Sequence, residues 1–153
     1  MSGELGIDEV LDLARSLGVE VKETDTPVFK GGVVDGRRVV LIPKGSLEDE
    51  SANIAILHEL GHIKFGHAGS RDPRQFVLHE LEANRWALTT MSGYPQEEWD
   101  WSILPGITED LADKFGLSLN EAWKVARDVA RKFGVGSTSL QKAGEELRYR
   151  EGR

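Results

Sequence analysis

The sequence predicts an α+β fold, in which a small antiparallel sheet of two to three strands packs with two central helices and a helical C-terminal part. Three observations support this class. Apolar residues repeat with helical spacing over residues 7–17, short β-branched runs follow between residues 19 and 43, and helical patterns dominate the rest of the chain. With 39% hydrophobic and 29% charged residues among 153, the chain has enough apolar surface for the core of one ordinary domain.

Residues 1–45 are expected to form one helix and the strands of the sheet. Gly18 ends the helix predicted over residues 7–17. The expected strands are the β-branched runs at residues 28–30, 33–34 and 39–42. Asp35-Gly36 between two of these runs is typical of a two-residue hairpin turn, and Pro43 and Gly45 end the last strand.

Residues 46–92 are expected to form the two central helices. The first begins between Ser46 and Ser51 and runs to about Lys64, and because it is apolar on nearly every side it should be buried. The second runs from about Pro73 to Met91, with proline at the favoured first position. Residues 96–106, which contain Trp99, Trp101 and Pro105, are interpreted as a connector with at most one helical turn.

Residues 93–153 are expected to form a helical tail. The segment at residues 111–117 reappears in similar form 18 residues later, at residues 129–135. This repeat is interpreted as two helices that each end in a glycine cap, with a helix-turn-helix-like packing unit as the alternative. The three sections, 1–45, 46–92 and 93–153, are expected to form a single domain over residues 1–153.

The charge balance and the residue types exclude several classes of protein. The net charge is −7, and residues 107–153 carry 9 basic and 8 acidic side chains, so no basic face for nucleic acid is expected. The absence of cysteine excludes disulfides, thiolate metal sites and cysteine nucleophiles. No stretch approaches 18 apolar residues, and the N-terminus lacks the pattern of a signal peptide. We therefore expect a cytoplasmic protein with no membrane partner and no direct nucleic-acid partner.

His58-Glu59-Leu60-Gly61-His62 is an H-E-x-x-H motif on the first central helix. Residues four apart lie on one face of a helix, so the imidazoles of His58 and His62 can bind the same Zn²⁺ ion. Glu59 is turned about 100° from His58 around the helix axis, and we expect it to be the general base that takes a proton from the metal-bound water. The motif predicts a zinc hydrolase with a zincin-like helix pair.

A catalytic zinc site needs a third protein ligand. The candidates are His67, His79, Glu80 and Glu82. The pattern H-E-x-x-H-x-x-G-x-x-H fails, because Phe65 and Ala68 stand where it needs glycine and histidine. On the second helix, a turn of about 100° per residue places Glu80 on the stripe that should face the core and Glu82 on the opposite face. We therefore predict Glu80 as the third ligand, and we expect Asn84, one turn later, to hydrogen-bond a ligand histidine.

The H-E-L-G-H motif and the segment Glu80-Leu81-Glu82-Ala83-Asn84-Arg85-Trp86-Ala87 together resemble the ImmA/IrrE family of zinc metallopeptidases. Members of this family pair an H-E-L-G-H helix with a second helix of the form E-x-E-A-N-x-F-A, and the resemblance covers roughly residues 50–92. It implies zinc at His58, His62 and Glu80, with Glu59 as general base. It also implies a small sheet before the metal helix, short helices after it, and a cytoplasmic role in the cleavage of helix-turn-helix repressors.

Two function classes remain open on the sequence. The first is a zinc endopeptidase with a protein or peptide substrate, for which a transcriptional repressor is a candidate. The second is a non-hydrolytic zinc-containing regulator or sensor that acts by protein binding, which a short chain with little room for a deep cleft favours. Glu59 favours the first class, because a structural metal site gains nothing from a carboxylate beside the metal. His67, His79 and Tyr94 are candidate stabilisers of an oxyanion, and none of them is assigned.

Overall fold

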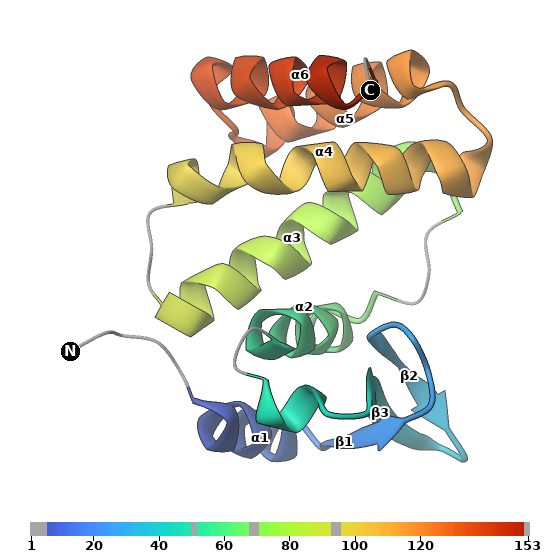
Figure 1. The fold of residues 1–153 in the computed structure, drawn as a ribbon, viewed down its shortest axis with the longest axis vertical. Helices are drawn as coiled ribbons and strands as arrows, with labels where there is room; N and C mark the ends of the chain where they lie inside the picture. Colours follow the sequence, from blue (N-terminus) through green and yellow to red (C-terminus); the bar gives the residue numbers. More distant parts are fainter. Residues whose placement is uncertain (1–5, 50–51, 68–70, 93–95, 152–153) are drawn as a thin grey trace. The chain divides into compact units, whose positions relative to one another are not determined.

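The computed structural model describes residues 6–49, 52–67, 71–92 and 96–151 (Figure 1). Side chains are described for all of these residues except 91–92 and 96–102. Its contacts divide the chain into two compact units. The first comprises Met1–Ala68 and Trp86–Gly93, and the second comprises Gly69–Arg85 and Tyr94–Arg153. Helix α3, Pro73–Ser92, contributes one part to each unit. The expectation of a single domain over residues 1–153 stays a prediction.

The first unit contains the sheet and the helices that flank it in the chain. Its elements are α1 (Ile7–Ser16), β1 (Val19–Thr24), β2 (Lys30–Val34), β3 (Arg37–Pro43), the 3₁₀ helix η1 (Ser46–Glu48) and α2 (Ala52–Lys64). Together with the helices of the second unit, they confirm the α+β class. Asp35 and Gly36, with φ angles of 52° and 78°, form the two-residue turn between β2 and β3 that the sequence predicts.

The sheet has the strand order β1-β3-β2 and is mixed, which corrects the expectation of a wholly antiparallel sheet. β2 and β3 are antiparallel as predicted, but β1 pairs with β3 in parallel, with Val21 opposite Val40. β3 is the most deeply buried strand, through Val39, Val40 and Ile42, and it takes the central position where both of its edges are paired. Because the chain reverses direction after each strand, the first and third strands run the same way.

Helix α2 packs on the sheet and forms the centre of the first unit. Ile56, Leu57 and Leu60 are fully buried, and their core cluster includes Val40 and Ile42 of β3. Residues of α1 and the last part of α3 join the same cluster. The prediction that α2 is buried is therefore confirmed, and the helix that carries the H-E-x-x-H motif is held by apolar contacts along its length.

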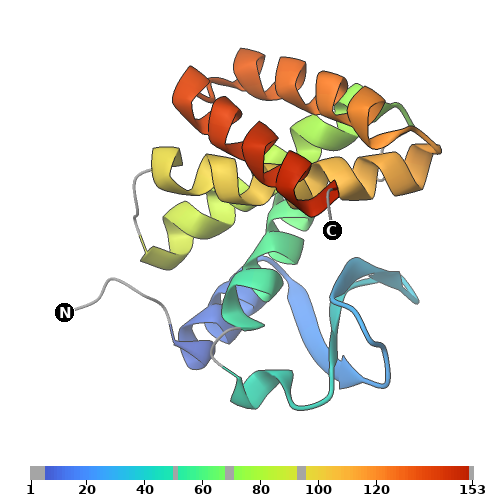
Figure 2. The ribbon, with the colours of Figure 1, turned by 45° about the horizontal axis from the view of Figure 1, so that its top comes forward.

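The second unit packs α4 (Gln96–Phe115), α5 (Leu119–Phe133) and α6 (Ser137–Glu151) against one another, and Figures 1 and 2 show α5 and α6 beside α4. The first part of α3 contributes Val77 and Leu81 to the core of this unit. The core residues from the other helices are mainly aliphatic and include Leu104, Ile107, Leu111, Ala126, Ala130, Leu140 and Ala143. The helical tail expected from the sequence is thus confirmed.

The connector expected over residues 96–106 is wrong, because α4 begins at Gln96 and continues through Pro105. A proline inside a helix removes one backbone hydrogen bond and is costly. Here Leu104, Ile107 and Leu111 recur at helical spacing and are all buried in the core of the second unit. The Thr108 hydroxyl also donates to the carbonyl oxygen of Leu104 at 2.8 Å. Packing of this helix face outweighs the local cost of the proline.

Two helices of the second unit end in the glycine caps that the repeat predicts. Gly116 and Gly134 have φ angles of 65° and 109°, in the left-handed region that favours glycine. After Gly116 the backbone N–H of Leu117 bonds the carbonyl of Ala112, and after Gly134 the N–H of Val135 bonds the carbonyl of Ala130. A hydrogen bond from a backbone N–H to the carbonyl oxygen five residues earlier is characteristic of the Schellman cap.

Asp128 of α5 accepts ion-pair contacts from three cations of the second unit. Arg74 of α3, Lys132 and Arg131 all contact its carboxylate, the last two at 3.3 and 2.8 Å. The hydrogen bond from Arg74 is the largest cause that lowers the pKa of Asp128 to about 2, and the lysine and the second arginine add to it. The contact with Arg74 joins α3 to α5 at the surface of the unit.

Replacing Asp128 with asparagine should make the free energy of unfolding change less with pH between pH 5 and pH 2. Because folding lowers the pKa of this carboxylate, its contribution is present above the unfolded pKa of about 3.9 and is lost as the pH falls toward 2. Urea unfolding followed by circular dichroism between pH 5 and pH 2 measures this. We expect the wild type to lose stability more steeply than Asp128→Asn, and Asp113→Asn, an exposed change on α4, to follow the wild type. Parallel curves for wild type and Asp128→Asn would contradict the assignment.

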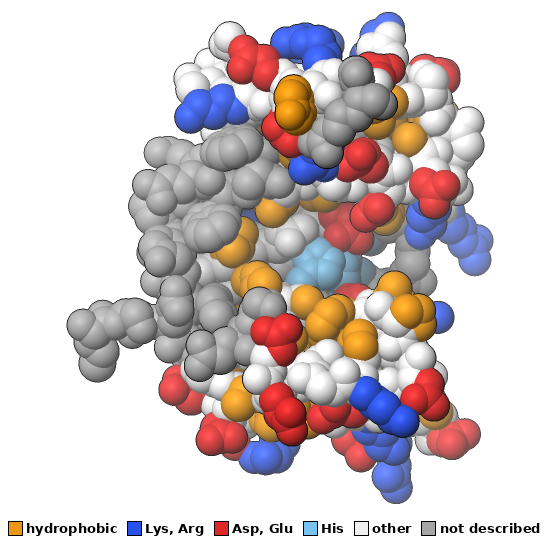
Figure 3. All heavy atoms as spheres, in the orientation of Figure 1, with side chains coloured by type: hydrophobic (Ala, Val, Ile, Leu, Met, Phe, Trp, Pro, Cys, Tyr) orange, Lys and Arg blue, Asp and Glu red, His pale blue; other side chains and the backbone are white. Residues whose placement is uncertain are grey.

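In the described parts of the chain, no helix is both long and apolar enough to cross a membrane. Figure 3 shows acidic and basic side chains interspersed on the face in view, in both units.

Candidate metal centre

The two histidines of the H-E-x-x-H motif point their Nε2 atoms at each other from successive turns of α2. The Nε2 atoms of His58 and His62 are 3.0 Å apart, and the two rings meet edge to face with their centroids 4.6 Å apart. Both side chains are half-buried. The helix is fixed on the sheet by its apolar residues, and both imidazoles belong to the first unit.

The donor atoms fit a zinc ion. Two nitrogen ligands of a tetrahedral zinc, each about 2.0–2.1 Å from the metal, lie about 3.3 Å apart, close to the observed separation of the two Nε2 atoms. His58, Glu59 and His62 each offer one ligand atom, and these atoms all lie within 4.8 Å of one another. Two imidazoles with a nearby carboxylate are a donor set that zinc prefers. The carboxylate of Glu59 is therefore close to the point where a metal between the imidazoles would sit.

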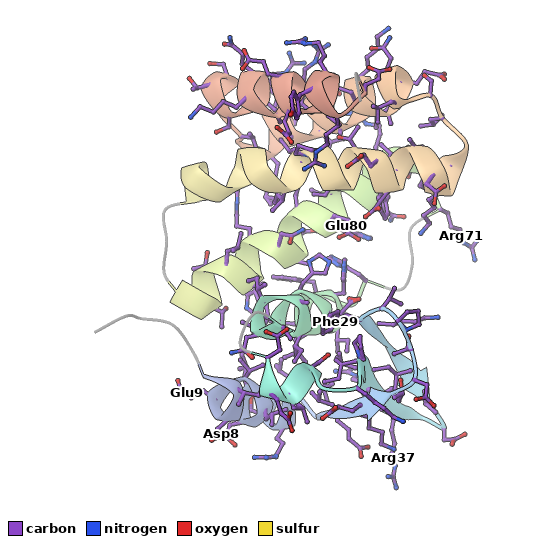
Figure 4. All side chains as sticks on the ribbon, viewed as in Figure 1. Asp8, Glu9, Phe29, Arg37, Arg71 and Glu80 are labelled. Carbon is purple, nitrogen blue, oxygen red and sulfur yellow. The ribbon has the colours of Figure 1, made fainter. Side chains whose placement is uncertain are left out.

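Strand β2 approaches α2 closely at Glu59. Gly31 lies opposite Val40 in the sheet, so both belong to the face that packs on α2. A Cβ atom on Gly31 would lie 3.5 Å from the carbonyl oxygen of Glu59, 3.6 Å from the Cβ of Glu59 and 3.4 Å from Ile63. Phe29, just before the strand, packs against the same core (Figure 4). The absence of a side chain at residue 31 thus sets how near the edge strand comes to Glu59.

A larger residue at position 31 should destabilise the first unit. An alanine methyl group fits at ordinary contact distance, whereas the branches of valine would meet the backbone of α2, which costs about 1–3 kcal/mol. Gly32 is the matched control, because a Cβ there has nothing within 4 Å. Chemical unfolding of Gly31→Ala, Gly31→Val and Gly32→Val should show a clear loss for Gly31→Val alone. Equal unfolding free energies for the two valine variants would contradict this close approach.

Glu80, the predicted third ligand, lies near the middle of α3 in the part that belongs to the second unit (Figure 4). Its side chain is half-buried. The burial of its neighbours agrees with the helix faces predicted from the sequence. Ala83 and Ala87, predicted on the face of Glu80, are fully buried, whereas Leu78 and Thr89, predicted on the opposite face, are exposed. The structure brings together His58, Glu59 and His62 within the first unit, and the role of Glu80 stays a prediction.

Two further polar residues of α3, Asn84 and Arg85, make contacts within the second unit. The side-chain amide of Asn84 donates to the carbonyl oxygen of Glu80 at 2.8 Å, and its predicted bond to a ligand histidine stays a prediction. The guanidinium of Arg85 stacks over the ring of Phe133 at 4.2 Å and donates to the carbonyl oxygen of the same residue. Arg85 therefore ties α3 to the end of α5.

Two of the three candidate oxyanion stabilisers, His67 and His79, are among the described residues. His67 lies beside His62, with their Nδ1 atoms 2.9 Å apart. His79 is half-buried on α3, in the second unit. Tyr94 lies outside the described residues. None is assigned as an oxyanion donor. Sequence reasoning missed the contact of His67 with His62, although Gly66 after the motif was a signal that the chain turns back there.

The comparisons with known proteins place the chain in a family. The family model described as Peptidase_M78, IrrE N-terminal-like domain, matches residues 14–124, which include the sheet from β1 onward, the motif helix and α3. No curated protein and no solved structure matches the chain. The matched range covers well over half of the 153 residues and contains His58, Glu59, His62 and Glu80. The chain therefore belongs to the Peptidase_M78 family of IrrE N-terminal-like domains.

Proposed function

We propose that this protein is a zinc-dependent endopeptidase that hydrolyses peptide bonds in a specific cytoplasmic protein. Membership of a metallopeptidase family supports the reaction class. The observation that carries the proposal is the convergence of the His58 and His62 Nε2 atoms, 3.0 Å apart, with the ligand atoms of both and of Glu59 within 4.8 Å of one another. His58 and His62 would hold the ion through Nε2, and Glu80 would be the third ligand.

A zinc ion bound there supplies a Lewis acid that polarises the scissile carbonyl and lowers the pKa of a water. Glu59 takes the proton of the attacking water through a carboxylate oxygen and then delivers it to the nitrogen of the leaving amine. Its side chain is half-buried on a helix that is apolar on most sides, which limits the water that competes for this carboxylate. Ile56, Leu57 and Leu60 hold the helix, and hence Glu59, in place.

The outer edge of strand β2 offers a place where an extended peptide substrate could bind. Among the described residues, β2 pairs with β3 alone, and it lies next to Glu59 through Gly31. Its residues other than Gly31 are exposed, including Val33 at 69%. A peptide that adds to the outer edge of β2 would gain main-chain hydrogen bonds and would pass beside the general base. This supports cleavage within a chain rather than at its end.

A helix-turn-helix repressor is the proposed substrate, and the experiment that tests it uses a candidate repressor of this class, chosen first from the genes next to the one that encodes this protein. The zinc-loaded protein is incubated with this repressor, and the products are read by intact-mass spectrometry. Two fragments whose masses sum to the repressor plus one water support an endopeptidase. A stable complex that forms without any fragment would instead favour the second function class, a non-hydrolytic regulator that acts by protein binding.

A further inference from the structure

Helix α2 ends in a cap that folds the chain back onto the second histidine of the motif. Gly66 has a φ angle of 70°, in the left-handed region. Its backbone N–H bonds the carbonyl of Ile63 at 3.1 Å, and the N–H of His67 bonds the carbonyl of His62 at 2.9 Å. This pair of bonds defines the Schellman motif, in which the residue after the glycine contacts the residue five positions earlier. The cap therefore places His67 against His62.

The same contact is apolar at the two comparable caps of the second unit. There the paired residues are Leu117 with Ala112 and Val135 with Ala130. An apolar pair is what the Schellman motif usually has at these two positions. At the end of α2 the pair is His67 with His62, and His62 carries a nitrogen of the proposed zinc site. The departure from an apolar pair occurs at the cap that follows the motif helix.

The two histidines of this cap, His62 and His67, contact each other through their Nδ1 atoms. The Nδ1 atoms of His62 and His67 are 2.9 Å apart, a hydrogen-bond distance, and Nε2 of His62 faces His58. A neutral imidazole with a lone pair for a metal on Nε2 carries its proton on Nδ1. His62 then donates from Nδ1 to Nδ1 of His67, which carries its own proton on Nε2. The ring of Phe65 stacks on His67 at 5.8 Å between centroids.

We propose that His67 is a positioning residue for the metal ligand His62, built into the cap of the motif helix. It accepts the Nδ1 proton of His62, which fixes the tautomer and the ring orientation that direct Nε2 of His62 toward the ion. This inference rests on the proposed zinc site and assigns to His67 neither metal ligation nor oxyanion stabilisation. A ligand histidine that loses such a partner loses both orientation and basicity.

Two variants of nearly the same shape separate the hydrogen bond from packing. His67→Asn keeps an acceptor oxygen at about the position of Nδ1, whereas His67→Leu fills that position with a methyl group and restores the apolar contact usual in this cap. Zinc affinity is measured by competition with a chromophoric chelator, and the absorption spectrum of the Co²⁺-substituted protein reports the ligand geometry. Far-UV circular dichroism and thermal unfolding of the metal-free proteins check the fold.

We expect His67→Leu to raise the Kd for Zn²⁺ about 10- to 100-fold and to change the Co²⁺ spectrum, and His67→Asn to recover most of the affinity. Equal Kd values within about twofold for wild type, His67→Leu and His67→Asn would overturn the inference while leaving the zinc site intact. If the leucine variant does not fold, a wild-type Kd and spectrum for His67→Ala would overturn it in the same way. Failure of the wild type itself to bind Zn²⁺ would overturn the proposed metal site together with the inference.

Discussion

Replacing Glu59 with glutamine should abolish peptide cleavage while zinc binding and the fold are retained. The amide is nearly isosteric with the carboxylate, but it cannot accept the proton of the attacking water. General-base catalysis contributes roughly 10²–10⁴ in rate, so the loss should be visible in any sensitive cleavage assay.

The control for this variant is Glu48→Gln, which removes an exposed carboxylate of η1 in the same unit. Both variants should bind one zinc per chain by elemental analysis, and Glu48→Gln should cleave at the wild-type rate. Cleavage by Glu59→Gln at the rate of Glu48→Gln would remove Glu59 from the role of general base.

Changing Glu80 to alanine should strip zinc from the protein, whereas Glu82→Ala should retain it. With Glu80 lost, two protein ligands remain, fewer than the three that a catalytic zinc site requires. The loss of affinity should exceed the roughly 10–100-fold that removal of an outer-shell partner costs. Elemental analysis of proteins purified without added metal measures the zinc content directly. Glu82 is the matched control, because it is an identical side chain two residues away on α3.

The opposite pattern, with zinc lost from Glu82→Ala and kept by Glu80→Ala, would show that the third-ligand assignment is wrong. Thermal unfolding adds an independent measurement. A metal that binds the native state alone stabilises it by about 2.7 kcal/mol at a free concentration 100 times its Kd. Zinc should therefore raise the melting temperature of the wild type and of Glu82→Ala, and leave that of Glu80→Ala nearly unchanged.

Most of the fold could be predicted where one local rule decides the structure. The glycine caps at Gly116 and Gly134 and the Asp35-Gly36 turn depend on backbone conformations that few residues adopt, so the sequence marks them. Helix α4 could not be predicted through Pro105, because the burial of Leu104, Ile107 and Leu111 decides it. The parallel pairing of β1 with β3 depends on which strand takes the centre, and that is a property of the whole sheet.

In the candidate site as well, the features that follow from local geometry could be predicted and the long-range contacts could not. The face shared by His58 and His62 follows from helix geometry, so their convergence could be read from the spacing. The contact of Gly31 with α2 joins residues far apart in the chain and needs the sheet register. The bond between His62 and His67 arises from the geometry of the cap, for which Gly66 was the one local signal.

The most direct test of the central claim is a titration of Zn²⁺ into chelator-treated protein, with peptide cleavage as the readout. The candidate helix-turn-helix repressor serves as substrate, and mass spectrometry detects the new termini. We predict no cleavage by the metal-free protein, a rate that rises to a plateau at one zinc per chain, and no cleavage by Glu59→Gln at any zinc concentration. Cleavage that persists after the metal is removed, or that Glu59→Gln performs as fast as the wild type, would contradict a zinc-dependent endopeptidase built on His58, Glu59 and His62.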